Sequence, residues 1–371
     1  MQKTGYLVLE DGSVFEGMSF GAIRETPGEV VFNTGMVGYP EGFTDPSYCG
    51  QILTMTYPLI GNYGVPAQSF QNNIPLHFES SRVWIAGLIV SSYIENSSHY
   101  QSVLSLSNYL AENDIPALSG IDTRSLTKTL RTSGVAKGVI TFKTTHLKNP
   151  PNRRIFFKDI NKENLVSYVS TKEIKIYGNG KYKILFIDCG CKSNQLRILL
   201  KQNATVIQVP WNYNLLSDQK GVKFDGVFIS NGPGDPKMIR ETIQTVSEVL
   251  KRNIPTFGIC LGNQILALSS GADTYKLKYG HRGQNQPVRD QKTGKCFITT
   301  QNHGFAVDTK SLQQGWESWF TNLNDGTNEG IRHTSKPFFS CQFHPESMPG
   351  PTDTEWLFEY FIEQIKKYKK I

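Results

Sequence analysis

One cysteine lies in a pattern that is typical of a catalytic nucleophile. Cys260 is the centre of Gly258-Ile259-Cys260-Leu261-Gly262, a G-x-C-x-G run between an apolar segment and a helical one. This is the spacing of a nucleophile elbow, with a thiol in place of a hydroxyl, and the sharp turn requires the two glycines. At the start of a helix the dipole favours a thiolate, and the Leu261 N–H would face a developing oxyanion. A buried structural cysteine in a tight turn is the alternative.

A histidine and a carboxylate near the C-terminus could complete a catalytic triad. In Phe343-His344-Pro345-Glu346 the two side chains are two positions apart, so in an extended chain they point to the same side. The carboxylate could then orient and stabilise the imidazole, as the third member of a triad does. His303 and His281 are rival bases, and His344 is preferred because only it has an acid at a short, fixed spacing. A surface histidine beside an incidental acid is the alternative.

A glycine- and proline-rich loop could stabilise negative charge. Asn231-Gly232-Pro233-Gly234-Asp235-Pro236 follows the apolar run Gly226–Ser230. Its exposed backbone N–H groups could donate to an oxyanion, whereas an ordinary turn is the simpler alternative. The G-x-x-x-x-G-K-[ST] pattern of a phosphate-binding loop does not occur in the chain.

A polar cluster near residue 302 could recognise a zwitterion. It reads Gln301-Asn302-His303-Gly304-Phe305 and precedes a strand-like run. The Asn302 side chain and the backbone at Gly304 and Phe305 are the candidate binding groups.

The elements around these motifs predict a parallel sheet. Strand-like and helical runs alternate from Tyr182 onward, which favours a mainly parallel sheet with helices on both faces. Ligands bind at the carboxyl ends of such strands, which selects the residues after Ser230 and Gly258. The expected strands are Tyr182–Ile187, Thr205–Val209, Gly226–Ser230, Pro255–Gly258 and Phe338–Phe343, and the expected helices are Ser193–Lys201, Ile239–Lys251 and Leu261–Ser270.

The first 145 residues show a different pattern of predicted elements, a mixture of short strands and helices. Asp11-Gly12 between Tyr6–Leu9 and Ser13–Phe15 predicts a hairpin. Further strands are expected at Val30–Phe32, Ile52–Thr56 and Val83–Ile89, and helices at Ser105–Asn113 and Thr123–Ser133, the last capped by Asp122. The fold class is therefore α/β. We expect an N-terminal α/β-type domain over residues 1–147 and a second domain over 181–371. A connector over 148–180 would join them, with clusters of helix- and strand-breaking residues at both ends.

Composition and charge argue against a membrane protein and against a nucleic-acid-binding protein. The chain has 371 residues, 38% hydrophobic and 19% charged, and a formal net charge of +7. No apolar run approaches the roughly 20 residues that span a bilayer, and the basic residues are not interleaved with aromatics, so neither a membrane nor a nucleic acid is expected. The six cysteines show no metal-ligand spacing, so no metal is expected. No targeting peptide is visible at the N-terminus, which predicts a soluble protein of the cytoplasm, or of the plastid stroma if the chain is organelle-encoded.

From Tyr182 to the C-terminus the chain resembles the class I glutamine amidotransferases, through the elbow, the loop at 231–236 and Phe343–Glu346. The first domain is similar to that of the small subunit of carbamoyl-phosphate synthetase, and the matching segments are Leu9–Gly17, Val31–Tyr39, Thr44–Tyr48 and Gly120–Arg124. The resemblance covers nearly the whole chain, apart from the connector.

This resemblance assigns residue roles. It implies that Cys260 is the nucleophile and that His344 and Glu346 complete the triad. The positions that match glutamine-binding residues are Ser47 from the first domain and Gly232, Gly234, Leu261, Gln264, Asn302, Gly304 and Phe305 from the second.

The resemblance also implies an activity and a partner. The chain would release ammonia from glutamine and pass it through protein to a large subunit. That subunit would use ATP and Mg²⁺ to make carbamoyl phosphate from bicarbonate, for pyrimidine and arginine biosynthesis. No cofactor is expected in this chain, which would act in a heterodimer.

Two positions depart from the family pattern, and two other functions are possible. Asn263 stands where the family usually has histidine, which predicts altered packing with activity retained, and Pro40 stands where it usually has glutamine. A stand-alone cysteine hydrolase is one rival, and the extra domain and Ser47 argue against it. A non-catalytic regulatory scaffold is the other, and the intact triad argues against that.

Overall fold

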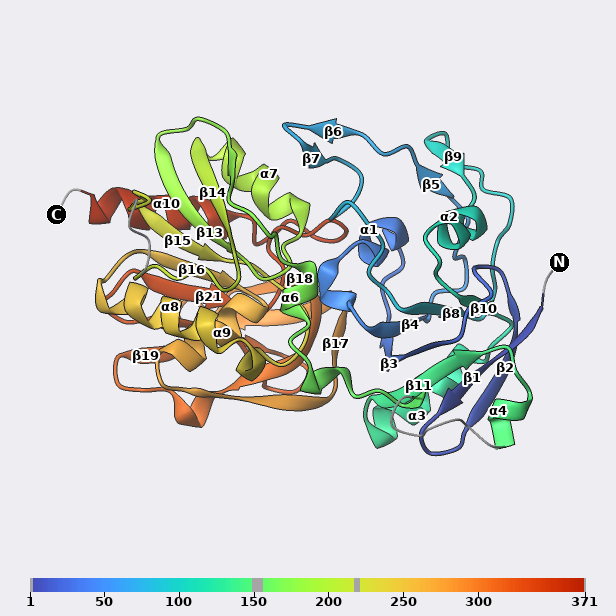
Figure 1. Ribbon diagram of the computed structural model, residues 1–371. Coiled ribbons are helices and arrows are strands. Elements are labelled where there is room, and N and C mark those ends of the chain that lie inside the picture. The colour runs from blue at the N-terminus through green and yellow to red at the C-terminus, as the bar shows by residue number, and fades with distance from the viewer. Residues whose placement is uncertain (1–2, 149–155, 217–220, 370–371) are drawn as a thin grey trace. The chain divides into compact units, whose positions relative to one another are not determined.

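The computed structural model describes residues 3–148, 156–216 and 221–369, and the chain divides into two compact units. Unit 1 comprises residues up to Phe70 and Pro75–Glu163, and unit 2 comprises Gln71–Ile74 and Asn164 onward. Figure 1 labels their elements.

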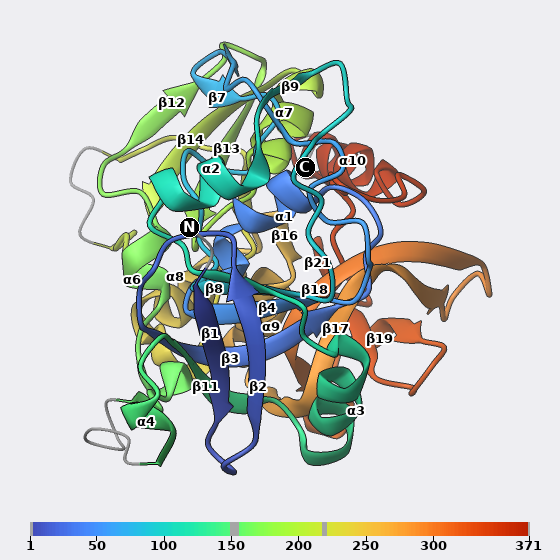
Figure 2. The same cartoon turned by 90° about the vertical axis from the view of Figure 1, so that its right-hand side faces the viewer.

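Unit 1 is built on a closed barrel, which the sequence did not predict. Its strands run in the order β1-β11-β3-β4-β8-β10-β2, and all of them except β10 are labelled in Figure 2. The pairs β3–β4, β4–β8 and β8–β10 are parallel, whereas the others are antiparallel. The barrel strands are β1 (Thr4–Leu9), β2 (Val14–Ser19), β3 (Thr26–Asn33), β4 (Gln51–Met55), β8 (Gly87–Val90), β10 (Ala117–Ser119) and β11 (Ala136–Thr141).

Helices, turns and short strands lie between and after the barrel strands in the sequence, and β6 and β7 extend into the stretch 71–74 that belongs to unit 2. The predicted hairpin is confirmed by the β1–β2 pairing, and Asp122 caps α3 by accepting a hydrogen bond from the Ser125 N–H, as expected. These elements are α1 (Tyr39–Phe43), η1 (Pro46–Tyr48), β5 (Val65–Pro66), β6 (Phe70–Gln71), β7 (Ile74–Pro75), β9 (Ser102–Leu104), α2 (Leu106–Glu112), α3 (Thr123–Ser133), α4 (Thr145–Lys148) and η2 (Ile160–Lys162).

Unit 2 is one sheet in the order β12-β14-β13-β15-β16-β21-β20-β19-β17-β18. The segment β14-β13-β15-β16-β21 is parallel, which confirms the prediction, and the remaining pairs are antiparallel. Its strands are β12 (Lys175–Tyr177), β13 (Tyr182–Asp188), β14 (Ala204–Pro210), β15 (Gly226–Ile229), β16 (Thr256–Ile259), β17 (Asp273–Asp290), β18 (Cys296–Asp308), β19 (Trp316–Asn322), β20 (Asn328–His333) and β21 (Phe338–Cys341).

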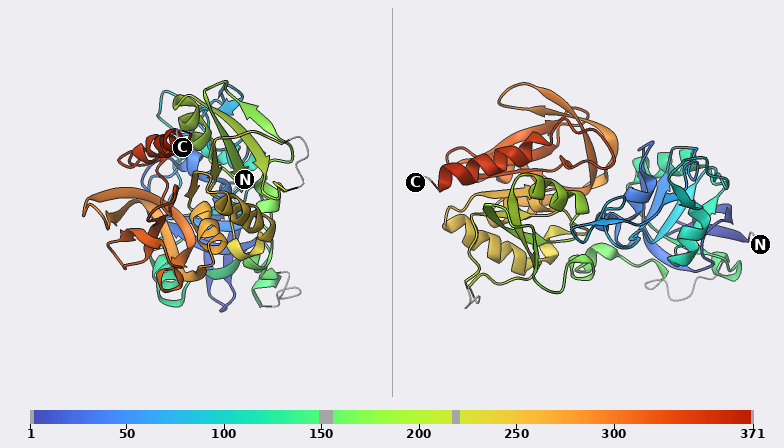
Figure 3. Two further views of the ribbon diagram at one scale, coloured as in Figure 1. Left: turned by 90° about the vertical axis from the view of Figure 1, so that its left-hand side faces the viewer. Right: turned by 90° about the horizontal axis from the view of Figure 1, so that it is seen from above.

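Helices cover both faces of the parallel segment because its strands are apolar on both sides. On β13, Phe186 packs with α7 and α10, whereas Leu185 and Ile187 pack with α8 and α9. Figure 3 shows α10 (red) and the yellow helices on opposite sides of the strands. The helices are α6 (Val166–Val169), α7 (Ser193–Lys201), α8 (Arg240–Lys251), α9 (Leu261–Ser269) and α10 (Trp356–Tyr368), with the short turns η3 (Pro236–Met238) and η4 (Thr309–Ser311).

The region expected to connect the domains contains ordered elements. β12 lies within it and pairs with β14 at the edge of the sheet. In the sequence, the boundary between the two compact units falls between Glu163 and Asn164. The breaker cluster at 149–154 lies outside the described residues. Among the described helices, none is long and apolar enough to cross a membrane.

Candidate active site

The nucleophile candidate sits at a strained junction between strand and helix. β16 ends at Ile259, α9 begins at Leu261, and Cys260 between them has φ 54° and ψ −102°. Positive φ is unfavourable for a residue with a Cβ, so the surrounding fold must impose it. A Cβ on Gly262 would lie 2.3 Å from the Ile229 carbonyl oxygen, and one on Gly258 would lie 2.4 Å from the Gly262 carbonyl oxygen. The two glycines are therefore required by close backbone approach, as the elbow pattern predicts.

The thiol is buried and faces the segment predicted to bind substrate. Cys260 is 2% exposed, and its Sγ lies 3.7 Å from the backbone oxygen of Asn302 on β18. Its position at the N-terminus of α9 places it near the positive end of the helix dipole, which stabilises a thiolate.

His344 and Glu346 form the pair that their spacing predicts. His344 Nδ1 lies 2.7 Å from Glu346 Oε1, and both side chains are buried. The His344 N–H of the backbone donates to the Thr300 carbonyl at 2.8 Å, which anchors the segment after β21 to β18. The geometry orients the imidazole so that its other nitrogen, Nε2, is free for chemistry; among the described residues it has no hydrogen-bond partner.

Electrostatics favour the protonated imidazole. Burial alone lowers the pKa of His344, but the negative charges of Glu346 and of a Cys260 thiolate outweigh it and raise this pKa from 6.5 to about 10. For Glu346, burial raises the pKa, but His344 and Lys192 outweigh it and the pKa is lowered. The site therefore holds a buried imidazolium beside the Glu346 carboxylate, so that a proton donor lies next to Cys260.

The start of α7 supplies partners for Glu346 that sequence reasoning missed. Lys192 Nζ lies 3.7 Å from Glu346 Oε1, and Gln195 Nε2 donates to the same oxygen at 3.2 Å. The Lys192 ammonium also donates to the Ser347 carbonyl, and Asn194 Nδ2 donates to the Glu346 carbonyl. Because these residues follow the carboxyl end of β13, the rule that selected the ends of β15 and β16 could have found them.

The glycine-proline loop lies against the nucleophile helix. A Cβ on Gly232 would lie 2.8 Å from Leu261 Cδ2 and 2.1 Å from the Cys189 carbonyl oxygen, so only glycine allows this approach. Asn231 Oδ1 accepts a hydrogen bond from the Lys192 N–H at 3.0 Å, and Gly234 has φ 86°. The loop near Gly232 thus packs against the side chain of Leu261, the first residue of α9, whose N–H is one of those that a helix leaves without an intrahelical partner.

Other predicted binding positions converge on the same helix. Gln264 on α9 donates to the Phe305 carbonyl at 3.0 Å and to Gln342 Oε1 at 3.2 Å. Together with the contact between Cys260 and Asn302, this brings the segment that contains Asn302, Gly304 and Phe305 to the nucleophile helix.

Ser47 lies in unit 1, in the turn η1. Its N–H donates to Asp45 Oδ1 at 2.9 Å, and the residue is buried. The contact of Ser47 with glutamine stays a prediction.

The structure accounts for both departures from the family pattern. Asn263 donates to Gln342 Oε1 at 2.9 Å and accepts from Ser340 Oγ at 2.8 Å, so the buried amide is satisfied on both sides. Pro40 lies in the first turn of α1, where a missing N–H costs no helical hydrogen bond.

The two rival bases belong to a separate cluster. His281 and His303 both lie within 3.7 Å of Glu329 on β20, and these three side chains could between them hold a metal ion. By contrast, it is His344 that interacts with Cys260.

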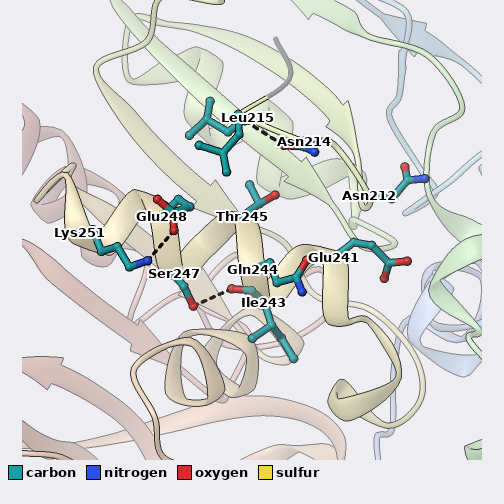
Figure 4. A pocket seen from close by; sticks show the side chains of 11 residues that line it. Asn212, Asn214, Leu215, Glu241, Ile243, Gln244, Thr245, Ser247, Glu248 and Lys251 are labelled. Carbon is teal, nitrogen blue, oxygen red and sulfur yellow. Dashed lines mark hydrogen bonds and ion pairs between the residues drawn. The ribbon is translucent and has the colours of Figure 1, made fainter.

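A pocket of about 440 Å³ lies elsewhere in unit 2 (Figure 4). It is lined by α8 and the segment that follows β14, including Asn212, Leu215, Gln244 and Lys251, and by no residue of the triad.

Two family descriptions match the chain. The description "Carbamoyl-phosphate synthase small chain, CPSase domain" matches residues 7–140, and "Glutamine amidotransferase class-I" matches residues 185–364.

Relatives match over almost the full chain. The carbamoyl phosphate synthase small chain of Pyrococcus furiosus is 44% identical over 374 residues and is covered completely, as is this chain. The multifunctional protein CAD of Squalus acanthias is 50% identical, over 98% of this chain and 16% of that protein. The mitochondrial carbamoyl-phosphate synthase (ammonia) of Mus musculus is 46% identical, over 99% of this chain and 24% of that protein.

This chain spans 16% to 24% of the longer relatives, which include multifunctional proteins from fungi, Dictyostelium and shark. It matches the small chain from Pyrococcus from end to end. With the elbow, the buried pair and both domain matches in place, the chain belongs to the family of carbamoyl-phosphate synthase small chains, with a class I glutamine amidotransferase domain in its second half.

Proposed function

We propose that this chain is the glutaminase subunit of a carbamoyl-phosphate synthase. In this proposal it hydrolyses glutamine to glutamate and ammonia and passes the ammonia to a large subunit. The observation that carries the proposal is the strained Cys260 at the N-terminus of a helix, coupled to a buried His344–Glu346 pair at 2.7 Å. Overall similarity would not carry it alone, because a relative named for ammonia is as similar as the others.

The chemistry follows from the charge state of the site. The Cys260 thiolate attacks the side-chain carbonyl carbon of glutamine, and the C–O π electrons move to oxygen. N–H groups at Leu261 and near Gly232 stabilise this oxyanion, typically by about 3 kcal/mol for each donor. His344 Nε2 then protonates the amine as the C–N bond breaks, which releases ammonia and leaves a γ-glutamyl thioester.

The second half of the reaction restores the enzyme. His344, now neutral, takes a proton from water as the water attacks the thioester, and the C–S bond breaks to give glutamate and the thiolate. Glu346 stabilises the imidazolium form in both halves without itself accepting the proton. The residues proposed to hold glutamine are Ser47, Gly232, Gly234, Leu261, Gln264, Asn302, Gly304 and Phe305.

The proposed partner is the large subunit of the synthase, which would use ATP and Mg²⁺ and consume the ammonia. This chain would need no cofactor of its own, because the triad supplies both nucleophile and proton. Transfer through protein is favoured because free ammonia in neutral water becomes ammonium, which is no nucleophile. The proposed location is the cytoplasm, or the plastid stroma for an organelle-encoded chain, and the proposed pathways are pyrimidine and arginine biosynthesis.

Cys260→Ser in the complex with the large subunit tests the proposal. Glutamate release should fall by on the order of 10³-fold or more, because a hydroxyl at this site is far less ionised than a thiol. Carbamoyl phosphate synthesis from added ammonia should continue, which shows that the complex is intact. Glutamate release at the wild-type rate would exclude Cys260 as the nucleophile.

A further inference from the structure

A second group of buried titratable side chains lies on the antiparallel part of the sheet in unit 2. It consists of His281 on β17, His303 on β18 and Glu329 on β20, and we call it the Glu329 cluster. The ladder pairs His281 directly with His303, whose rings are 4.9 Å apart. Glu329 Oε1 lies 3.3 Å from His281 Nδ1 and 3.7 Å from His303 Nε2. The proposed reaction uses none of the three.

The His281 end of the cluster carries a positive charge. Its Nε2 lies 2.9 Å from Asp325 Oδ2, so both ring nitrogens face carboxylates. Burial lowers the pKa of His281, but Asp325 and Glu329 outweigh it and raise this pKa to about 9. At neutral pH the ring is an imidazolium that donates to both acids.

The His303 end donates to the backbone of its own strand. Its Nδ1 lies 2.9 Å from the Phe305 carbonyl oxygen, and its Nε2 lies 3.3 Å from Gln301 Oε1. Burial lowers the pKa of His303 despite the nearby Glu329, so the ring is neutral. The shorter contact assigns the single proton to Nδ1, which then donates to Phe305.

The strand that His303 holds reaches the nucleophile. The Phe305 carbonyl accepts from His303 and also from Gln264 of α9, at 3.0 Å. Three residues earlier, the Asn302 carbonyl faces the Cys260 thiol. The segment 301–305 is therefore fixed on one side to the nucleophile helix and on the other to the Glu329 cluster.

We propose that Glu329 and His281 are positioning residues for glutamine binding: they hold His303, and through it the backbone of segment 301–305, in the geometry that receives the substrate. This inference rests on the proposed function, since the glutamine contacts of Asn302, Gly304 and Phe305 come from it. The two residues act through His303 and not on the reacting atoms. Glu329 is suited to this because a fully buried carboxylate between two imidazoles allows few alternative arrangements.

A metal ion is the other occupant that two histidines and a glutamate could hold. Their donor atoms lie within 4.8 Å of one another, whereas tetrahedral zinc with bonds of about 2.0–2.2 Å needs donors roughly 3.3 Å apart. An amide already serves the same acceptors: Asn322 Nδ2 lies 3.1 Å from Glu329 Oε1 and 3.5 Å from Gln301 Oε1. The contacts therefore favour a hydrogen-bonded cluster.

Glu329→Gln in the complex with the large subunit is the main test. The change keeps the side-chain volume but removes the charge that holds the imidazolium of His281, whose ring packs against His303. The KM for glutamine should rise about tenfold to a hundredfold while kcat stays within about threefold, since the variant loses binding geometry and no reacting group. Synthesis from added ammonia should be unchanged.

Two further variants keep the test decisive if Glu329→Gln fails to fold. Asp325→Asn weakens the cluster from its half-exposed end and should raise KM about twofold to fivefold. Glu317→Gln is the matched control: it is the same substitution on the neighbouring strand β19, where the acid pairs with Arg332, and it should leave KM and kcat unchanged.

The outcomes separate the possibilities. Wild-type KM in both Glu329→Gln and Asp325→Asn would overturn the inference, and so would a fall in kcat at unchanged KM. The cluster would instead be a metal site if the wild-type protein contained one equivalent of zinc that Glu329→Gln lacks. In that case, removal of the zinc by a chelator would also raise the KM of the wild-type protein to that of the variant. Failure of the proposed function would show differently, as full glutamate release by Cys260→Ser.

Discussion

At the scale of single residues, the three triad side chains differ in how much each does alone. In the proposed reaction Cys260 forms and breaks bonds, His344 moves protons, and Glu346 only orients and stabilises. Besides His344, Glu346 Oε1 has two further neighbours, Lys192 and Gln195 at the start of α7, so this carboxylate is held from two parts of the chain. Its proposed role is electrostatic, and it would act through the His344 ring that it contacts.

Glu346→Gln should therefore be milder than His344→Ala. The amide can still accept the hydrogen bond from Nδ1, but it cannot stabilise the imidazolium by charge, whereas His344→Ala removes the proton donor itself. We expect kcat for glutamine hydrolysis to fall by about one to two orders of magnitude less in the Glu346 variant. Steady-state glutamate release measures both. A near-normal His344→Ala beside an inactive His303→Ala would show that the base is His303.

At the scale of elements, the conformation of the elbow depends on how closely α9 packs against the ends of β15 and β16. The helix starts so close to the sheet that the backbone of Gly262 touches the end of β15. This close approach fixes the left-handed conformation of Cys260 and so the direction of its thiol.

Gly262→Ala should disturb both fold and activity. The new Cβ would lie 2.3 Å from the Ile229 carbonyl oxygen, which is backbone and cannot turn away, so we expect a loss of about 1–3 kcal/mol in the free energy of unfolding. Glutamate release should fall because Cys260 moves with the helix. The matched control is Gly42→Ala in α1, where a Cβ meets nothing within 4 Å and a neutral or slightly stabilising effect is expected. Denaturant unfolding of both variants measures this, and equal stabilities would refute the packing argument.

His281, on β17, should make the free energy of unfolding depend on pH. The folded pKa of His281 is raised to about 9 by Asp325 and Glu329, against the opposing effect of burial, while the unfolded value is near 6.5. A raised pKa means that the stabilisation is fully present below about pH 6.5 and is lost as the pH rises through about 9.

The measurement is the difference in unfolding free energy between the wild-type protein and His281→Gln. This difference should be largest at pH 6 and should shrink steadily toward pH 9.5. A difference that is constant over this range would show that His281 contributes by packing and not by charge.

At the scale of the whole molecule, the first domain contributes no triad residue, yet it occupies about the first two fifths of the chain. In the proposed function it binds the large subunit and provides Ser47 to the glutamine site. Contacts of this kind can shift active-site loops between active and inactive arrangements.

The isolated chain should therefore be a poor glutaminase that accelerates on binding a large subunit. We expect an increase of about tenfold or more, which lies within the typical range of coupling between sites. Glutamate release by the purified chain, alone and with a stoichiometric large subunit, measures it. Equal rates, together with no stable complex on gel filtration, would favour the stand-alone hydrolase.

Much of unit 2 could be predicted because its signals are local. The helix at Ser193–Lys201 has the predicted bounds, and α8, α9 and the parallel strands differ from prediction by only one or two residues at their ends. The triad pair was also a local signal, since His344 and Glu346 are two residues apart. In each case the periodicity of apolar residues, or the geometry of an extended chain, contains the information.

Only the tertiary structure decided what depends on pairing between distant segments. The barrel of unit 1 closes through β1 and β11, which are far apart in sequence, and no local pattern reports such a partner. Lys192 reaches Glu346, and Glu329 reaches His281 and His303, because the order of strands in the sheet brings these distant segments together. Local chemistry thus determined which residues could react, while strand order, set by the burial of apolar surface over the whole domain, decided which side chains hold them in place.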